Sequence, residues 1–339
     1  MLRSLALLPA LLGLAPSSAS AQVLDQTDLV AGQFARLEVT GAAPGDSVAF
    51  LWSFAGTGAG PCFPSAGVCL DLLQPTVLAI VPADAAGAAA LEGFVPETVA
   101  PVPVATQGVV VAAAGPPYPK TNAVAASFLP LGHYDDDFEG VALGADWSVL
   151  HPELATVTVS GGALEIVPTA GGLQNIWFHG AEGPLVWRLV SGDFEVTARL
   201  TVDDPQNPGA PPPLSYRLAG ILLQDPASTA ADHDFCHVAL GAGDGATPLA
   251  AEDKTTLDSN SDFLLHPVPG LTGELRLVRS NDVVSMSHRV DDTQPWTPLR
   301  QHVRPDLPQT LRVGLMAYSA SSPPRVRARF DWIRFATAP

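Results

Sequence analysis

Residues 192–202 read GDFEVTARLTV, and the pattern of this stretch sets the class of fold. After a Gly-Asp turn, every second residue from Phe194 to Val202 is apolar, and the residues between them are polar or charged. Side chains of a strand point alternately to its two faces, so the pattern predicts a half-buried strand. One face of this strand should lie on a core, and the other should face water or a bound ligand.

Similar runs recur along the chain and predict an all-β protein. The 339 residues include 30 Gly and 33 Pro, which interrupt helices and favour turns. No amphipathic helix of useful length separates the later runs, so they predict a two-sheet sandwich. Strand-like runs occur at 34–39, 47–53, 77–81, 89–94 and 107–112, and later in ATVTVS, ALEIVP, LVWRLV, FEVTARLTV, RLAGILLQ, FCHVALG, ELRLVRS, VVSMSHRV, LRVGLMAYS and VRARFDWIRF.

The sequence divides into three parts. Residues 1–21 contain Arg3, an apolar stretch and a small-residue end, the pattern of a secretory signal peptide. Residues 22–130 carry short strands at regular turn spacing, typical of a small antiparallel sandwich. The composition changes at DDDFEG, so residues 131–339 form the expected second domain. Because of this signal peptide we expect a secreted, periplasmic or cell-surface protein. No later apolar run is long enough for a transmembrane helix, so we expect no membrane span.

The charge balance limits the classes of partner. The formal net charge is −17, with 34 acidic residues against 17 Lys and Arg. Nucleic acid and anionic membranes both attract basic surfaces, so neither is an expected partner. The sequence does not indicate an oligomeric state.

Three cysteines must be placed in an oxidising compartment. Cys62 and Cys69 flank FPSAGV in a Gly- and Pro-rich loop and are close enough in sequence to close a small ring. Cys236 lies far away, within an apolar strand pattern. We therefore expect a Cys62–Cys69 disulfide and a buried, free Cys236.

Each of the two expected domains resembles a known domain family. GAAPGDSV, GPC…GVCLDLL and PADAAGAAAL resemble an immunoglobulin-like domain of secreted bacterial proteins, which implies a spacer or attachment role. DDFEG…DW, SGGALEIVP, GDFEVTARL, LAGILLQD, LRVGLMAYS and FDWIRF resemble the concanavalin A-like lectin/glucanase jelly roll. The closest version is found in uncharacterised secreted domains and as the carboxyl-terminal module of some β-xylosidases. The implied architecture is an immunoglobulin-like sandwich (22–130) followed by a jelly roll (131–339).

The jelly-roll resemblance also implies a structural calcium ion. FDWIRF is similar to the final strand of related glucanases, whose Asp helps to hold calcium beside the first strand. The matching residue is Asp331, and Asp137 lies in the acidic run that opens the domain. Calcium takes six to eight oxygen ligands, which carboxylates and nearby backbone carbonyls supply. The alternative is that Asp331 bonds a neighbouring turn and the acidic run is solvated.

Catalysis is not expected from the acidic residues. Retaining and inverting glycosidases need two facing carboxylates, and the glucanases of this fold carry them as E-x-D-x-x-E on one strand. Glu153, Glu165, Glu195 and Glu274 are each isolated in the sequence. A serine hydrolase is not indicated either, since G-x-S-x-G is absent. A metal cluster in ADHDFCH (231–237) is disfavoured because neighbouring strand residues point to opposite faces.

A carbohydrate-binding module needs only an outward face with planar apolar groups and hydrogen-bonding groups. The sequence candidates for contact with a polysaccharide or glycoconjugate are Trp177, Trp187, His237, Arg276, Arg289 and Tyr318. The leading hypothesis is an exported, non-catalytic, carbohydrate-binding protein. The alternatives are an adhesive or structural scaffold that binds no sugar and a glycoside hydrolase of unrecognised type.

Overall fold

The structure is a computed structural model, and it describes residues 22–172, 175–229 and 231–338. The predicted signal peptide, residues 1–21, lies outside the described residues. Strands make up almost all regular structure, which confirms the all-β prediction. The short 3-10 helices are Pro64–Ala66, Leu131–Tyr134 and Pro152–Leu154. Among the described residues, no helix has the length and apolar character needed to span a membrane.

The chain forms two compact units that differ slightly from the predicted parts. Unit 1 contains residues up to 27, 36–92 and 102–127, and unit 2 contains 28–35, 93–101 and 128–339. Two short segments of the amino-terminal part therefore pack with the carboxyl-terminal part. Val30 lies in the main core of unit 2 with no exposed surface, and the Gln33 Oε1 atom accepts a hydrogen bond from the Ser191 amide.

Two sheets and a small hairpin account for the strands up to β10. Their inner faces share a core that includes Val39, Val48, Phe50 and Val110. One sheet has the order β1(Val23–Gln26), β3(Phe34–Thr40), β8(Ala89–Phe94); the other has the order β2(Leu29–Val30), β10(Lys120–Leu129), β9(Pro103–Val111), β4(Ser47–Ser53), β7(Thr76–Pro82). The hairpin of β5(Cys62–Phe63) and β6(Val68–Cys69) carries the Cys62–Cys69 disulfide, which confirms that prediction.

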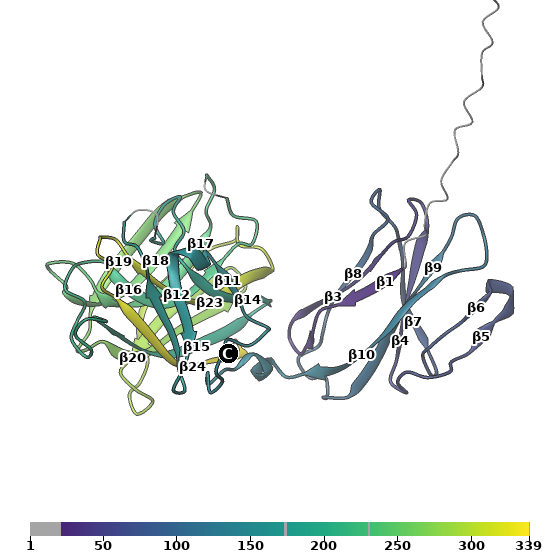
Figure 1. The fold of residues 1–339 in the computed structure, drawn as a ribbon, viewed down its shortest axis with the longest axis horizontal. Helices are drawn as coiled ribbons and strands as arrows, with labels where there is room; N and C mark the ends of the chain where they lie inside the picture. The colour runs from purple at the N-terminus through teal and green to yellow at the C-terminus, as the bar shows by residue number, and fades with distance from the viewer. Residues whose placement is uncertain (1–21, 173–174, 230, 339) are drawn as a thin grey trace, which may run out of the picture. The chain divides into compact units, whose positions relative to one another are not determined.

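Unit 2 is built on two seven-stranded antiparallel sheets, visible in Figure 1 as the part that contains β11 to β24. The β17 sheet has the order β11(Ser148–Leu150), β14(Leu185–Ser191), β23(Thr310–Ser319), β16(Arg217–Gln224), β17(Phe235–Ala242), β18(Leu249–Leu257), β19(Asn260–Pro267). The β15 sheet has the order β12(Ala155–Val159), β13(Leu164–Pro168), β24(Arg327–Thr337), β15(Phe194–Asp203), β20(Thr272–Ser280), β21(Val283–Arg289), β22(Thr297–Val303).

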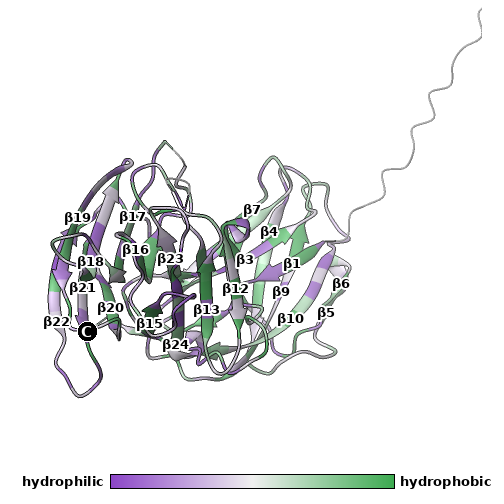
Figure 2. Ribbon diagram, turned by 60° about the vertical axis from the view of Figure 1, so that its left-hand side comes forward, coloured by the Kyte–Doolittle hydropathy of each residue, from purple (hydrophilic) through white to green (hydrophobic). Residues whose placement is uncertain are grey.

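Alternation of apolar residues places the main core between these two sheets. In β15 the residues Phe194 to Val202 alternate between buried and half-buried, as GDFEVTARLTV predicts. Cys236 and Val238 of β17 join the same core, and Cys236 is free and buried, as expected. Figure 2 shows the resulting apolar colouring along β13 and β16. The strand order also brings the start of the domain to its end, since Asp136 pairs with Ile333 of β24.

Candidate functional site

The sequence candidates for sugar contact lie on two different sheets. Trp187, His237 and Tyr318 belong to β14, β17 and β23 of the β17 sheet, on the face turned away from the main core. Arg276 and Arg289 belong to β20 and β21 of the β15 sheet. The six residues therefore do not form one site. Strand periodicity gives the face on which a residue lies within its sheet, but not which sheet the strand joins.

The outer face of the β17 sheet is covered where an open stacking surface was expected. Trp177 and His237 have no exposed surface, and Tyr318 is 2% exposed. The segment 175–184 lies over this face, and Trp177 packs edge-on against Phe235 with ring centroids 5.4 Å apart. Trp177 therefore fills a second apolar core. The expectation of an open face is wrong here, because the loop between β13 and β14 buries it.

A buried polar cluster lies beneath this covering segment. His237 Nε2 and Glu252 Oε1 are 2.7 Å apart, and Tyr318 donates its hydroxyl to the same oxygen at 2.9 Å. The Lys254 Nζ atom lies 2.8 Å from Glu252 Oε1 and donates to the Trp177 carbonyl at 3.1 Å. Glu252 Oε1 is thus contacted by His237, Tyr318 and Lys254. Glu252 Oε2 has no hydrogen-bond partner in the described structure.

Electrostatics fix the protonation states within the cluster. Burial opposes ionisation of Glu252, but the Lys254 ammonium and the His237 hydrogen bond outweigh it and lower the pKa of Glu252 to about 2. Burial lowers the pKa of His237 and raises that of Tyr318 well above its usual value. At neutral pH these shifts keep Glu252 ionised and leave His237 and Tyr318 uncharged, so the carboxylate of Glu252 forms its ion pair with Lys254.

Beside the cluster lies a cavity with a volume of about 280 Å³. It is lined by Ile176, Phe178, Tyr216, Lys254, Phe263, Tyr318 and Ala320. The Lys254 Nζ atom lies 5.0 Å from the ring centroids of Phe178 and Phe263 and 5.5 Å from that of Tyr318. Phe178, Tyr216 and Phe263 are half-buried, whereas Lys254 and Tyr318 are buried. We call this hollow the Lys254 cavity; its aromatic walls lead from the surface to a charged floor.

Local backbone structure places these side chains. Lys254 and Phe263 are direct partners across β18 and β19, so they share a face of the sheet. The Tyr216 amide donates to the Gly243 carbonyl at 2.8 Å just before β16 begins. The His179 amide donates to Ser261 Oγ at 2.9 Å, which holds Phe178 against β19. These contacts bring the three rings together: the ring centroid of Phe263 lies 6.0 Å from that of Phe178 and 6.3 Å from that of Tyr216.

Sequence reasoning missed most of this site. His237 and Tyr318 were candidates, whereas Phe178, Tyr216, Lys254 and Phe263 were not. The signal that could have found them is the run Glu252-Asp253-Lys254 inside a strand-length segment, because charges inside a strand need partners when the strand is buried.

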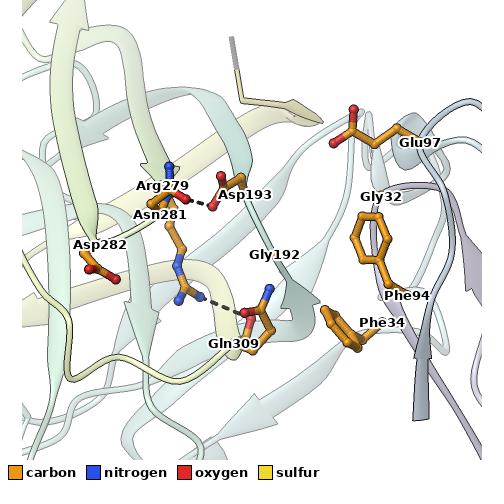
Figure 3. Close-up of a pocket in the computed structure, with 10 residues that line it drawn as sticks. All are labelled: Gly32, Phe34, Phe94, Glu97, Gly192, Asp193, Arg279, Asn281, Asp282 and Gln309. Atoms are coloured by element: carbon orange, nitrogen blue, oxygen red, sulfur yellow. Dashed lines mark hydrogen bonds between the residues drawn. The ribbon is translucent and has the colours of Figure 1, made fainter.

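A larger hollow of about 500 Å³ also lies in unit 2 (Figure 3). It is lined by Gly32, Phe34, Phe94, Glu97, Gly192, Asp193, Arg279, Asn281, Asp282 and Gln309. Figure 3 shows the rings of Phe34 and Phe94 next to each other, with centroids 5.5 Å apart. Arg279 donates to the Leu307 and Gln309 carbonyls, both at 3.2 Å. Its charged group therefore fastens the loop before β23, and we take this hollow as the second candidate ligand site.

Arg276 and Arg289 stack on the ring of Trp296, which directly precedes β22. Their guanidinium groups lie 4.7 and 4.3 Å from the ring centroid of Trp296. Arg289 also pairs at 2.6 Å with Glu274, which Arg199 contacts at 3.4 Å. On the β17 sheet, Arg312 lies 5.1 Å from the Trp187 centroid. These arginines satisfy neighbouring groups of the fold, and Trp187, Arg276 and Arg289 line neither of the two hollows.

The calcium candidates lie beside arginines. Asp137 pairs with Arg334, and Asp331 lies 3.5 Å from Arg199 and 3.7 Å from Arg329. Calcium at Asp137 and Asp331 stays a prediction, and the ion would compete with these guanidinium groups. A separate group of carboxylates, Asp232, Asp234 and Asp258, has oxygens within 4.8 Å of one another.

Comparison with known proteins shows similarity at the level of fold. No family model matches the chain, and no curated protein matches it. A glycoside hydrolase family 43 protein, BlXynB from Bacillus licheniformis, is 13% identical with a TM-score of 0.50, covering 93% of this chain and 64% of that one. A xylan β-1,4-xylosidase from Bacillus halodurans is 12% identical with a TM-score of 0.48 and the same coverages. The Emp47p carbohydrate recognition domain is 10% identical with a TM-score of 0.40, covering 61% of this chain and 96% of that one.

The likeness to BlXynB agrees with an all-β fold of several sheets, and the jelly-roll description of residues 131–339 stays a prediction. The chain spans 64% of the length of the two Bacillus proteins. At such identities the likeness concerns the fold alone. The immunoglobulin-like description of residues 22–130 stays a prediction.

Proposed function

We propose that this protein is an exported, non-catalytic carbohydrate-binding protein that holds its ligand in the Lys254 cavity. The observation that supports the proposal is a hollow with half-exposed aromatic walls and a buried hydrogen-bond donor at its floor. Sugar rings present apolar C–H faces that pack on aromatic rings, and their oxygens accept hydrogen bonds from N–H groups. Phe178, Tyr216 and Phe263 supply the rings, and Lys254 supplies the donor.

The volume of the cavity allows about one sugar unit of a glycan to enter it. Its volume of about 280 Å³ lies just below the range of about 300–1,000 Å³ that is usual for drug-sized ligands. The cavity is therefore suited to a chain end or a side branch of a polysaccharide or glycoconjugate. The rest of the glycan would stay outside.

The charge states favour binding over hydrolysis. A general acid for glycoside cleavage needs a raised pKa, whereas that of Glu252 is lowered to about 2. Glu252 Oε1 already has three hydrogen-bonding partners, which weakens it as a base or nucleophile. Glu274 is 3% exposed and paired with two arginines. We therefore place a glycoside hydrolase of unrecognised type behind the binding module.

Residues 1–21 would direct export to a secreted, periplasmic or cell-surface location, and residues 22–130 would act as an immunoglobulin-like spacer or attachment module. Calcium would be structural. A scaffold that binds no sugar is the competing hypothesis, and it makes the opposite prediction for the experiment below.

The test is a glycan screen with the purified full chain. Plant, algal and bacterial polysaccharides would be immobilised, and bound protein and released sugar would be measured in the same wells. Two variants locate the site: Phe263→Ala alters the Lys254 cavity, and Phe94→Ala alters the hollow of Figure 3. We expect binding that Phe263→Ala weakens at least about tenfold, as loss of a stacked ring does, and that Phe94→Ala leaves unchanged. The reverse result would move the site to the Figure 3 hollow, and no binding to any glycan would favour the scaffold.

A further inference from the structure

The floor of the Lys254 cavity has one hydrogen-bond donor that the described residues leave unused. An ammonium group carries three N–H bonds. Glu252 Oε1 at 2.8 Å and the Trp177 carbonyl at 3.1 Å take two of them. Lys254 lines the cavity and is only 3% exposed, so bulk water reaches its third N–H poorly. A ligand that offers one acceptor at this position would complete the coordination of the ammonium group.

The charge of the floor selects the kind of acceptor. Glu252 already neutralises Lys254, and both side chains are buried. A carboxylate or sulfate placed here would add a second negative charge beside Glu252 in a medium of low dielectric constant. A cationic group would face the ammonium directly. The favoured ligand group is therefore a neutral acceptor.

The apolar lining of the cavity determines which chemical group can carry this acceptor. Besides Lys254, the lining consists of Ile176, Ala320 and four aromatic residues. The Tyr318 hydroxyl is committed to Glu252, so few wall groups remain to bond ligand hydroxyls. A sugar hydroxyl buried without a partner costs free energy, whereas a methyl group does not.

We propose that the Lys254 cavity takes the acetyl group of an acetylated sugar. The acetyl carbonyl accepts the third N–H of Lys254, and its methyl group packs on the apolar wall. The sugar ring lies nearer the surface against the half-buried Phe178, Tyr216 and Phe263. This inference rests on the proposed function and names the ligand class of the same site.

The experiment compares neutral glycans that differ only in acetylation, using the full chain. One pair is acetylated xylo-oligosaccharide and the same preparation after mild alkaline deacetylation. The other is β-1,4-linked N-acetylglucosamine pentamer and the β-1,4-linked glucose pentamer, which lacks the acetamido group. We expect at least one acetylated member to bind about tenfold or more tightly than its partner, the effect of about one hydrogen bond and a buried methyl group.

Variants connect this preference with the cavity. Phe263→Ala should weaken binding, and Phe94→Ala should not. Glu252→Gln combined with Lys254→Met removes the donor without leaving an unpaired buried charge, so it should abolish the preference for acetylated glycans. Equal binding of both members of each pair would overturn the inference and leave the proposed function standing. Acetyl-dependent binding that ignores the cavity variants would also overturn it, and absence of binding to every glycan would overturn both.

Discussion

Glu252 and Lys254 lie two residues apart on β18 and form a buried ion pair, with Lys254 Nζ 2.8 Å from Glu252 Oε1. Because alternate residues of a strand share a face, both side chains point to the outer side of the β17 sheet. There the pair meets Tyr318, His237 and the covering segment 175–184. This relationship makes the floor of the cavity polar although its surroundings are apolar.

Removing the ammonium alone should destabilise the protein. Lys254→Met leaves Glu252 ionised and buried with its main counter-charge gone, which costs about 3–5 kcal/mol of unfolding free energy. Urea unfolding followed by tryptophan fluorescence measures the loss. The double variant Glu252→Gln/Lys254→Met should recover most of it, and an equal loss in the double variant would show that packing, not charge, dominates.

The same pair should make stability depend on acid pH. The folded-state pKa of Glu252 is lowered to about 2 from a usual value of 4.5. A lowered pKa contributes stability that is fully present above the unfolded value and is lost as pH falls through the folded value. We therefore expect about 3 kcal/mol to disappear progressively below pH 4.5, with most of it lost near pH 2. Denaturant curves between pH 7 and pH 2 test this, and the double variant should show a shallower decline than the wild type.

The disulfide should add modest stability to unit 1. Cys62 and Cys69 close a short loop, with a sequence separation of 7. The chain-entropy estimate for such a loop is about 2–3 kcal/mol. Replacing both residues with serine should lower the unfolding free energy by this amount or less. A thiol reagent should find no reactive group in the native protein, since Cys236 is buried, and one thiol after denaturation. Three thiols after denaturation would contradict the pairing.

Calcium binding can be tested through thermal stability. A ligand that binds only the native state raises Tm with its concentration. If calcium joins Asp137 and Asp331, titration with calcium should raise Tm, and Asp331→Ala should abolish the rise. Asp258→Asn is the matched variant, because it alters the separate group Asp232, Asp234 and Asp258. An unchanged Tm with calcium and with chelator would leave the arginines as the partners of Asp137 and Asp331.

The protein should release no sugar from the glycans that it binds. Glu252 is held ionised, and Glu274 is held between Arg199 and Arg289, so neither is suited to act as a general acid. A reducing-end assay over long incubation measures release. Detectable turnover that is lost in Glu274→Gln or Glu195→Gln would establish a hydrolase and contradict the binding-only proposal.

Strands with a clean apolar alternation could be predicted from the sequence. GDFEVTARLTV predicts the burial pattern of β15, and FCHVALG places Cys236 in the core with His237 on the opposite face. The disulfide followed from the spacing of Cys62 and Cys69. In each case the deciding information is local, within a few residues of the chain.

The candidate site could not be predicted in the same way. β18 contains Glu252, Asp253 and Lys254 in succession, and all three are buried, so the strand carries no apolar alternation. Glu252 and Lys254 find partners on one face, and Asp253 finds Arg300 and His266 on the other. Apart from the Glu252–Lys254 pair itself, these partners come from other strands or, for the Trp177 carbonyl, from the covering segment. The covering segment 175–184 is a loop. Its position depends on tertiary contacts, which the hydrophobic periodicity of the sequence does not predict.

The packing of Leu29 and Val30 has a practical consequence for cutting the chain. β2 runs parallel to the end of β10, where Leu29 pairs with Phe128 and Val30 pairs with Leu129. A protein truncated at the predicted boundary, residue 131, would lose Val30 from its core and leave the Ser191 amide without the Gln33 acceptor. Such a fragment should express poorly or aggregate, although it retains strands β11 to β24. An expression clone of the carboxyl-terminal fold therefore has to start near residue 28 and carry the intervening unit with it.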